Sequence, residues 1–574
     1  MDVLLSVYHD RKALLYDVGV AAIAVNLGLR QGWIPLPGQL ASWDTPALLS
    51  TALITVFAVC MATRLFSARK HDSTSKSEVA VLPYWIPGLG HLPQFIFGGE
   101  AFLKNTRKTS LQDGFALNLA GIKHTIIDNP ALADAISEKE ASIVEGDQLA
   151  TTLRRNVFGF PDDKKNSPIQ KPAALSNDFY EGIFAQPQAE DLLKRTISKF
   201  KENMPNLVSF LDSLVDQSPW ERVSDTSAVE LADGRKLAET NLLSLMTELL
   251  GQSMNSAYAG TAFVDDYPEL HADLGVIGKS FSMMATGLPR WVPLPRLPAG
   301  YIARKRLLGR LEKLQSSYDP DDISVLFEAS HEALPGSEAK AAKSRAAVDL
   351  SLIWALNDCT RNLAFWLLVH ILSQPQLVDR IREEITPYAR AVQPSNDFGL
   401  PEPPRLELDV EGLEEKCPLF SSCYAETVRL YDTAWAVKKV KQDFTVTETQ
   451  SSTEYSFKKG EYIDVSRRLR QTSSRYVSEA GEFRPDRFVM LDEAGKAPKM
   501  DWDAASNCEG MWSMGKNMLF TQKTCLAFAA SVLVMWEVEP VERAGWRLPG
   551  YRQGASIAIP TRDIRVRISR RKLE

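Results

Sequence analysis

The sequence is poor in the residues that build metal sites and disulfide frameworks. Its 574 residues include 6 cysteines and 7 histidines, and no two cysteines form a Cys-x-x-Cys pair. This scatter argues against the disulfide framework of a small secreted domain and favours a reducing compartment. It also argues against a structural zinc site, which needs closely spaced Cys and His pairs. We therefore expect no metal cluster made of protein side chains.

A surplus of basic residues is also lacking. The 66 Lys and Arg residues face 72 Asp and Glu residues, which gives a formal net charge of −6. Proteins that bind nucleic acid gain much of their affinity from clustered Lys and Arg, so nucleic acid is not an expected partner. Hydrophobic residues make up 45% of the chain, which is too many for a disordered protein. The sequence also lacks internal repeats, which excludes a solenoid.

One long run near the N-terminus, 45–63, carries no formal charge and approaches the roughly 20 residues that span a bilayer. We expect a single-pass transmembrane helix over 45–67. Asp44 precedes the run and basic residues follow it, so the positive-inside rule places the main domain in the cytosol. A cleaved signal peptide and a buried core helix are the alternatives.

The flanking segments complete this N-terminal organisation. Residues 1–44 form a tail with a short apolar segment at 18–29, which either lies in the membrane interface or forms a hairpin with the transmembrane helix. Residues 68–80 are polar and are expected to form a linker.

The rest of the chain, 81–574, is expected to form one mainly α-helical domain with small antiparallel β-sheets. Helical periodicity is strongest in five segments, at 189–217, 237–251, 301–315, 346–372 and 377–391. Alternating strand patterns are fewer and come late, at 443–448, at 454–466 with a turn at 459–460, and in the C-terminal runs SIAIP and DIRVRIS.

A pair of charges in the fragment Glu426-Thr-Val-Arg429 lies at helical spacing i and i+3, on one helix face. Such a pair is usually an ordinary surface pair. A second arginine, Arg487, follows in the loop FRPDRF, and its guanidinium could complete a Glu-Arg-Arg cluster. Buried charges persist only when they are paired, and planar guanidinium groups suit a carboxylate well.

Five motifs, in this order, resemble the cytochrome P450 family: PYWIPGLGH, WALNDCTRNLAFWLL, CYAETVRL, FRPDRF and GKNM. The likeness extends over about residues 80 to 570, and is strongest to a fungal branch of specialised metabolism that is similar to prostacyclin synthases and sterol 7α-hydroxylases. It implies that Glu426, Arg429 and Arg487 form a structural cluster behind a haem, and that helix 346–372 crosses the distal face of the haem.

The family's chemistry depends on a cysteine thiolate bound to the haem iron. In related fungal sequences this cysteine follows GKNM, whereas here Leu519 follows Met518. Either Leu519 replaces the cysteine directly, or the family's C-P-G-R is deleted at this point, which is the alignment that we favour. Cys525 is a poor substitute, because Thr521 stands where the turn glycine belongs, and Cys508 lacks both the preceding aromatic residue and the glycine.

Three functions remain open. The chain could be a non-redox cyclase or isomerase acting on a hydrophobic biosynthetic intermediate without haem, with Asp358 as general acid or base, Thr360 as a nearby hydroxyl and Arg361 for charge stabilisation. It could be a haem monooxygenase with an unrecognised ligand or a mis-spliced ligand loop, which would use O2 and an NADPH-cytochrome reductase at the endoplasmic reticulum membrane. It could also be a non-catalytic scaffold or binding protein.

Overall fold

The computed structural model describes most of the chain, and it divides the chain into two compact units. The first unit comprises Met1–Leu149 and Trp435–Arg470, and the second comprises Ala150–Ala434 and Gln471–Glu574. The described residues are 45–72, 78–109, 114–137, 139, 143–145, 147–161, 182–184, 187–231, 234–292, 294–334, 339–394, 404–433, 435–448, 453–491, 497–509 and 516–572. The tail expected at 1–44, with its apolar segment 18–29, lies outside them.

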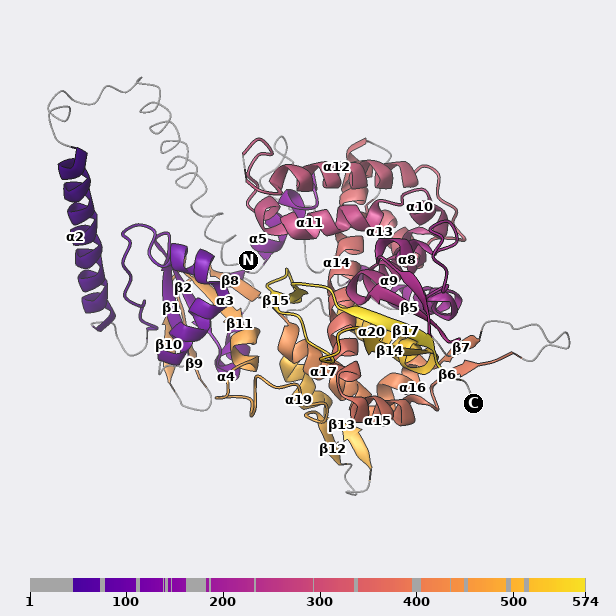
Figure 1. Ribbon diagram of the computed structural model, residues 1–574. Helices are drawn as coiled ribbons and strands as arrows, with labels where there is room; N and C mark the ends of the chain where they lie inside the picture. Colours follow the sequence, from indigo (N-terminus) through magenta and orange to yellow (C-terminus); the bar gives the residue numbers. More distant parts are fainter. Residues whose placement is uncertain are drawn as a thin grey trace. The chain divides into compact units, whose positions relative to one another are not determined.

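The first unit is built around a five-stranded sheet (Figure 1). Its strand order is β1 (Gly114–Leu119), β2 (Ile122–Ile127), β11 (Tyr462–Ser466), β8 (Trp435–Val440) and β3 (Val144–Glu145). Strands β1 and β2 form a tight hairpin, whereas β11 pairs with β2 in parallel. The sheet therefore joins strands from two distant parts of the sequence.

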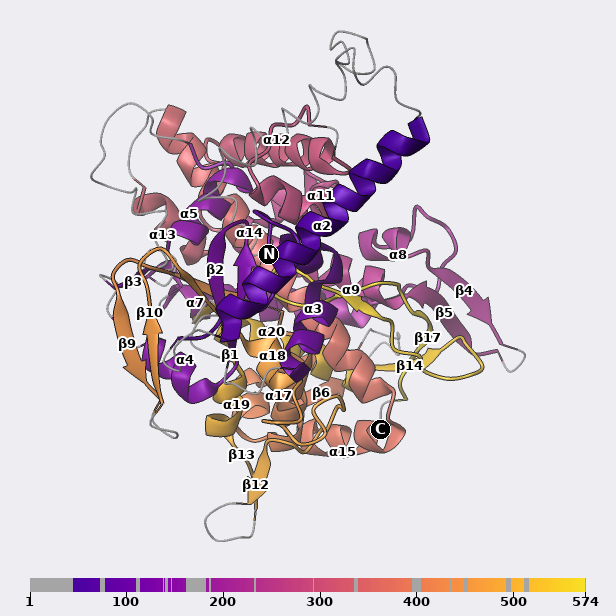
Figure 2. The same cartoon turned by 90° about the vertical axis from the view of Figure 1, so that its left-hand side faces the viewer.

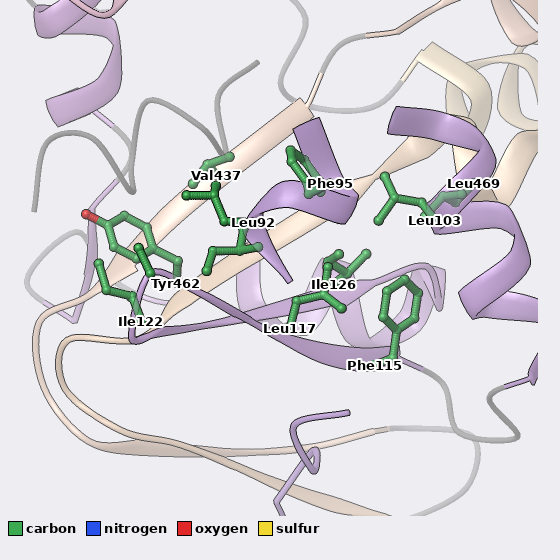
Figure 3. Close-up of a cluster of buried hydrophobic side chains, with 12 residues drawn as sticks. Leu92, Phe95, Leu103, Phe115, Leu117, Ile122, Ile126, Val437, Tyr462 and Leu469 are labelled. Carbon is green, nitrogen blue, oxygen red and sulfur yellow. The ribbon is translucent and has the colours of Figure 1, made fainter. Parts of the chain in front are cut away.

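Hydrophobic side chains cover both faces of this sheet. On one face, Leu92, Phe95 and Leu103 of helix α3 (Leu92–Thr109) pack in one cluster with Phe115 and Leu117 of β1 (Figure 3). A second buried cluster includes side chains of helix α4 (Pro130–Ser137) and of the hairpin formed by β9 (Phe444–Thr447) and β10 (Glu454–Phe457). Because both faces are buried, the strands are rich in aliphatic residues on both sides.

The N-terminal apolar run is helical and forms α2 (Thr45–Asp72). Within this helix, Arg64 donates a hydrogen bond to the carbonyl oxygen of Pro83, and its guanidinium lies 5.5 Å from the Trp85 ring centroid. Over the described part of the chain, no helix is long and apolar enough to cross a membrane. The transmembrane assignment of 45–67 is therefore not supported.

The second unit is centred on one long helix, α14 (Ala339–Leu372) (Figure 1). It packs against α9 (Leu242–Ala259), α12 (Leu297–Leu314), α17 (Pro418–Tyr431) and α20 (Lys516–Met535). Residues 363–369 are all buried, which is typical of a helix surrounded by other helices. The other helices of ten or more residues in this unit are α7 (Gln188–Asn203), α11 (Leu270–Ala285) and α15 (Pro375–Ile385).

Small sheets complete the second unit. Four strands lie side by side in the order β14 (Trp536–Pro540), β17 (Arg565–Arg570), β5 (Lys236–Asn241) and β4 (Ser227–Glu230) (Figure 2). Three two-stranded ladders accompany them, formed by β6 (Ala389–Val392) with β7 (Arg405–Leu408), β12 (Val489–Leu491) with β13 (Pro498–Met500), and β15 (Tyr551–Arg552) with β16 (Ile559–Pro560). The prediction of a mainly helical fold with small antiparallel sheets is confirmed.

Four local predictions were wrong. The segments 189–217 and 377–391 were predicted to be helical throughout, but α7 ends at Asn203 with only a short 3-10 turn after it, and α15 ends at Ile385, before β6 begins at Ala389.

The segment 237–251 was predicted to be helical throughout, but its start forms β5, because pairing with β17 and β4 outweighs local helix propensity. Helix α9 begins only at Leu242, where the carboxylate of Asp563 accepts hydrogen bonds from the amides of Leu243 and Ser244. The segment 454–466 is not one hairpin either, because β10 pairs with β9 whereas β11 pairs with β2 and β8.

Candidate functional site

The structure brings together the three residues of the predicted Glu-Arg-Arg cluster. Glu426 and Arg429 lie on the buried helix α17, and Arg487 is half-buried on the loop before β12. Arg429 donates to both carboxylate oxygens of Glu426 at 2.7 and 2.8 Å, and Arg487 Nε donates to them at 2.9 and 3.0 Å. One buried carboxylate thus pairs with two guanidinium groups.

The Arg429 side chain also fixes the chain that follows. Its Nη1 donates to the carbonyl oxygens of Gln471 and Ala480, and its Nη2 donates to that of Glu482. A single buried arginine therefore satisfies three backbone acceptors in a segment with little regular structure. This cluster orders the loop that leads to Arg487.

The candidate acid of the central helix, Asp358, is buried, with 5% of its surface exposed. Its Oδ2 atom has no hydrogen-bond partner among the described residues. Burial raises the pKa of this carboxyl to about 6, although the nearby charges of Arg361 and Arg552 oppose the shift. A carboxyl with such a pKa can both donate and accept a proton near neutral pH.

The neighbouring polar residues of α14 are partly satisfied within their own helix. Arg361 Nε donates to the carbonyl oxygen of Asn357 at 2.9 Å, and Asn362 Nδ2 donates to that of Asp358 at 2.8 Å. The Thr360 hydroxyl lies 3.5 Å from the hydroxyl of Thr521 on α20. Arg361 and Asn362 therefore pair locally, whereas the Asp358 carboxylate does not.

A second set of polar residues meets α14 beside this site and was missed from the sequence. Asn357 Nδ2 donates to Asn255 Oδ1 on α9 at 2.8 Å, and Asn255 Nδ2 lies 2.8 Å from His271 Nε2 on α11. The other ring nitrogen of His271 lies 2.5 Å from Glu248 Oε1. Glu248 and Asn255 lie seven residues apart, on one face of α9, and this spacing was the available signal.

The described residues do not fit a haem-thiolate site. Leu519 lies in the first turns of α20 with 45% of its surface exposed, and its side chain has no atom that could bind iron. Cys525 lies in the middle of α20, where its thiol donates to the carbonyl oxygen of Thr360 at 3.6 Å. Burial raises the pKa of this thiol well above its ordinary value, which opposes formation of the thiolate.

Residues 510–515, which precede α20 in the sequence, lie outside the described residues, as does the side chain of Cys508 on α19 (Trp502–Glu509). Among the side chains that are described, no group of three or more His, Cys, Asp or Glu residues could hold a metal ion. The protein side chains described therefore offer no alternative metal centre.

A comparison with models of protein families finds no match. Among curated proteins, the chain is 24% identical over 441 residues to cytochrome P450 monooxygenase efuG of Hormonema carpetanum, covering 73% of this chain and 71% of that protein. It is 23% identical over 517 residues to cytochrome P450 monooxygenase poxD of Penicillium oxalicum, covering 88% and 94% respectively.

A third relative is lanosterol 14-alpha demethylase of Candida tropicalis, which is 23% identical over 434 residues and is covered to 75% of its length. The matches to these three relatives span 73%, 88% and 74% of this chain. For proteins of this kind, haem is the expected cofactor. In its helical fold, its charge cluster and these matches, the chain is similar to proteins of the cytochrome P450 family over most of its length.

Proposed function

We propose that this chain is a cytochrome P450-family protein that acts on a hydrophobic biosynthetic intermediate without haem-thiolate chemistry, as a cyclase or isomerase. The observation that carries this proposal is the contact between α14 and α20. Thr360, on the helix expected to face the haem, lies against Thr521 and Cys525 of the helix expected to follow the haem ligand. Neither Leu519 nor Cys525 is suited to bind iron at this point.

Asp358 is the proposed general acid and base. Its buried carboxyl has a pKa raised to about 6 and an oxygen without a hydrogen-bond partner among the described residues. In an isomerisation, Asp358 would donate a proton to one atom of the substrate and remove a proton from another, so that no electrons are gained or lost. Arg361, one helical turn away, would stabilise negative charge that develops on the substrate.

The second candidate function is a haem monooxygenase, and the family relatives favour it. Curated relatives that match most of this chain bear the name monooxygenase. This candidate requires an iron ligand other than Leu519 and Cys525, or a ligand loop absent from the given sequence. Under it, we propose an NADPH-cytochrome reductase as the redox partner.

The first experiment is an absorption spectrum of the purified full-length protein, with a CO difference spectrum after reduction. We expect neither a Soret band nor a CO complex of the thiolate type. A normal thiolate spectrum would overturn the non-redox proposal and establish the second candidate. As a matched variant, insertion of Cys-Pro-Gly-Arg after Met518 restores the family's motif, and we expect this variant to gain haem.

The second experiment separates an enzyme from a scaffold. The purified protein is incubated without NADPH with an organic extract of its source organism in which the gene has been deleted, and the extract is followed by mass spectrometry. A cyclase or isomerase converts one component into a product of the same mass, whereas a monooxygenase adds one oxygen atom and needs NADPH. The Asp358→Asn variant should abolish the conversion, and the absence of any conversion by the wild-type protein would favour a scaffold.

A further inference from the structure

The hydrogen bonds around Asn357 have one direction from end to end. Asn357 Nδ2 donates to two oxygens, that of the Ile353 carbonyl at 2.7 Å and Asn255 Oδ1 at 2.8 Å. Both hydrogens of this amide are thereby used, and an amide nitrogen has no third. Ile353 O can only accept, so the nitrogen of Asn357 must face it and the oxygen must face the other way.

The other end of this series of hydrogen bonds, at Glu248, requires the same direction. The Glu248 carboxylate accepts, so the hydrogen of His271 lies on Nδ1 and the bond of 2.5 Å runs from His271 to Glu248. His271 Nε2 is then an acceptor, and it accepts from Asn255 Nδ2 at 2.8 Å. The remaining atom of the Asn255 amide, Oδ1, accepts from Asn357. Two pure acceptors, one at each end, therefore leave a single arrangement for both amides.

One acceptor is left over. Asn357 Oδ1 has no hydrogen-bond partner among the described residues, and Asn357 is fully buried. The residue facing it on α9 is Gly251, where a β-carbon would lie 3.1 Å from Asn357 Oδ1 and 2.8 Å from His271 Nε2. A buried acceptor without a donor costs about 1 to 3 kcal/mol. A donor group on a bound ligand would remove this cost at Asn357 Oδ1.

We propose that Asn357 Oδ1 accepts a hydrogen bond from a hydroxyl or N–H group of the hydrophobic ligand, and that Glu248, His271 and Asn255 are positioning residues that hold the Asn357 amide in this orientation. The ligand class is thus an apolar molecule with a donor group. A ketone or ether at the same place would set two acceptors against each other. This inference holds whether or not haem binds, so it does not depend on the proposed function.

The tautomer of His271 tests the direction of the chain. Full-length protein labelled with nitrogen-15 in histidine gives the two ring-nitrogen shifts, and the His271→Gln variant identifies the signals of His271 among the 7 histidines. We expect the hydrogen of neutral His271 on Nδ1. A hydrogen on Nε2 would reverse every bond up to Asn357 and would overturn the proposal.

Matched probes test the ligand class. 2-Adamantanol and 2-adamantanone are rigid apolar cages that differ in a hydroxyl against a carbonyl group. Binding can be followed by calorimetry. The fluorescence of the protein's 12 tryptophans is a second measurement, because one of them, Trp354, lies one helical turn from Asn357 and stacks on Phe281 at 4.7 Å between ring centroids. We expect the alcohol to bind about fivefold more tightly than the ketone, the ratio of one net hydrogen bond.

Variants locate this preference. Asn357→Leu should abolish it. Asn362→Leu should keep it, because Asn362 is a buried asparagine of the same helix whose only hydrogen bond among the described residues is to the carbonyl of Asp358. Glu248→Gln removes the fixed acceptor with little change of shape, and it should at least halve the preference for the alcohol. This variant also replaces Asn357→Leu as the test if Asn357→Leu does not fold. Equal affinities in the wild type, no binding of the alcohol, or a preference that survives in Asn357→Leu or is unchanged in Glu248→Gln would overturn the proposal.

Discussion

The thiol of Cys525 donates a hydrogen bond to the carbonyl oxygen of Thr360, with 3.6 Å between sulfur and oxygen. Thr360 belongs to the central helix α14, and its carbonyl would otherwise accept only from within that helix. The contact makes Cys525 part of the packing between α14 and α20. Cys525 is therefore expected to contribute to stability and to be dispensable for any cofactor.

Replacing Cys525 by alanine tests this role. The sulfur is fully buried, so its loss leaves a small cavity and should lower the free energy of unfolding by about 1 to 2 kcal/mol. Urea unfolding measures this change, and the absorption spectrum should equal that of the wild type. Cys423→Ala, which removes an equally buried thiol on α17, is the control. Loss of a Soret band in Cys525→Ala alone would contradict the prediction.

The Glu426 carboxylate should be the most sensitive single group of the charge cluster. Glu426→Ala leaves the guanidinium groups of Arg429 and Arg487 buried or half-buried without their anion, which should cost about 3 to 5 kcal/mol. Denaturant unfolding and the yield of soluble protein report the loss. Arg484→Ala removes an exposed ion pair with Glu479 and should change stability by less than about 0.5 kcal/mol. Equal effects of the two substitutions would argue against a buried cluster.

Asp358 should make stability depend on pH. Its pKa is raised from 3.8 to about 6 in the folded protein, so between these values the folded state holds a proton that the unfolded state has released. The contribution of Asp358 to stability therefore falls as pH rises through this window, by a total of roughly 3 kcal/mol, and is constant above it.

The Asp358→Asn variant lacks this titration. Its free energy of unfolding, measured in urea, should differ little from that of the wild type near about pH 4 and should exceed it by a few kcal/mol near about pH 7. If Asp358 also acts in catalysis, the activity of the wild type should change with an inflection near pH 6. A stability difference that is the same at all pH values would show that burial of the carboxyl is not its cause.

Two helical glycines should respond in opposite ways to alanine. In Gly251→Ala the new β-carbon would lie 2.8 Å from His271 Nε2. The hydrogen-bonded side chains of His271 and Asn357 must then shift, and the free energy of unfolding should fall by about 1 to 3 kcal/mol. Gly275→Ala on α11 meets no atom within 4 Å and should raise stability by about 0.5 to 1 kcal/mol through better helix propensity. Thermal unfolding of both variants measures this contrast, and a stabilised Gly251→Ala would contradict the packing described here.

Local spacing was enough to find the residues of the charge cluster, because Glu426 and Arg429 share one helix face and Arg487 lies in a recognisable loop. It failed for β5. This strand pairs with β4, shortly before it in the sequence, and with β17, more than 300 positions after it. Strand formation there depends on long-range pairing, which a local pattern does not contain.

The series of hydrogen bonds from Glu248 through His271 and Asn255 to Asn357 could not be predicted from the sequence, for a different reason. Its members lie on α9, α11 and α14, and the direction of each hydrogen bond follows from partners on another helix. The sequence pointed to Asp358, Thr360 and Arg361 on the central helix, but it could not tell which of the polar residues there pair with each other. The structure separates them: Arg361 and Asn362 bond their own helix, whereas Asn357 also donates to Asn255 of α9.

The order of strands in the first unit has a consequence during protein synthesis. Strand β2 leaves the ribosome early, but β11, which pairs with its free edge, follows only after roughly 330 further residues, about half a minute at ordinary rates of translation. Until then the edge of β2, with the sequence IKHTII, has no β11 to pair with. An unpaired apolar edge invites pairing with other chains, so the nascent β1–β2 hairpin is the segment where chaperone binding should matter most for yield.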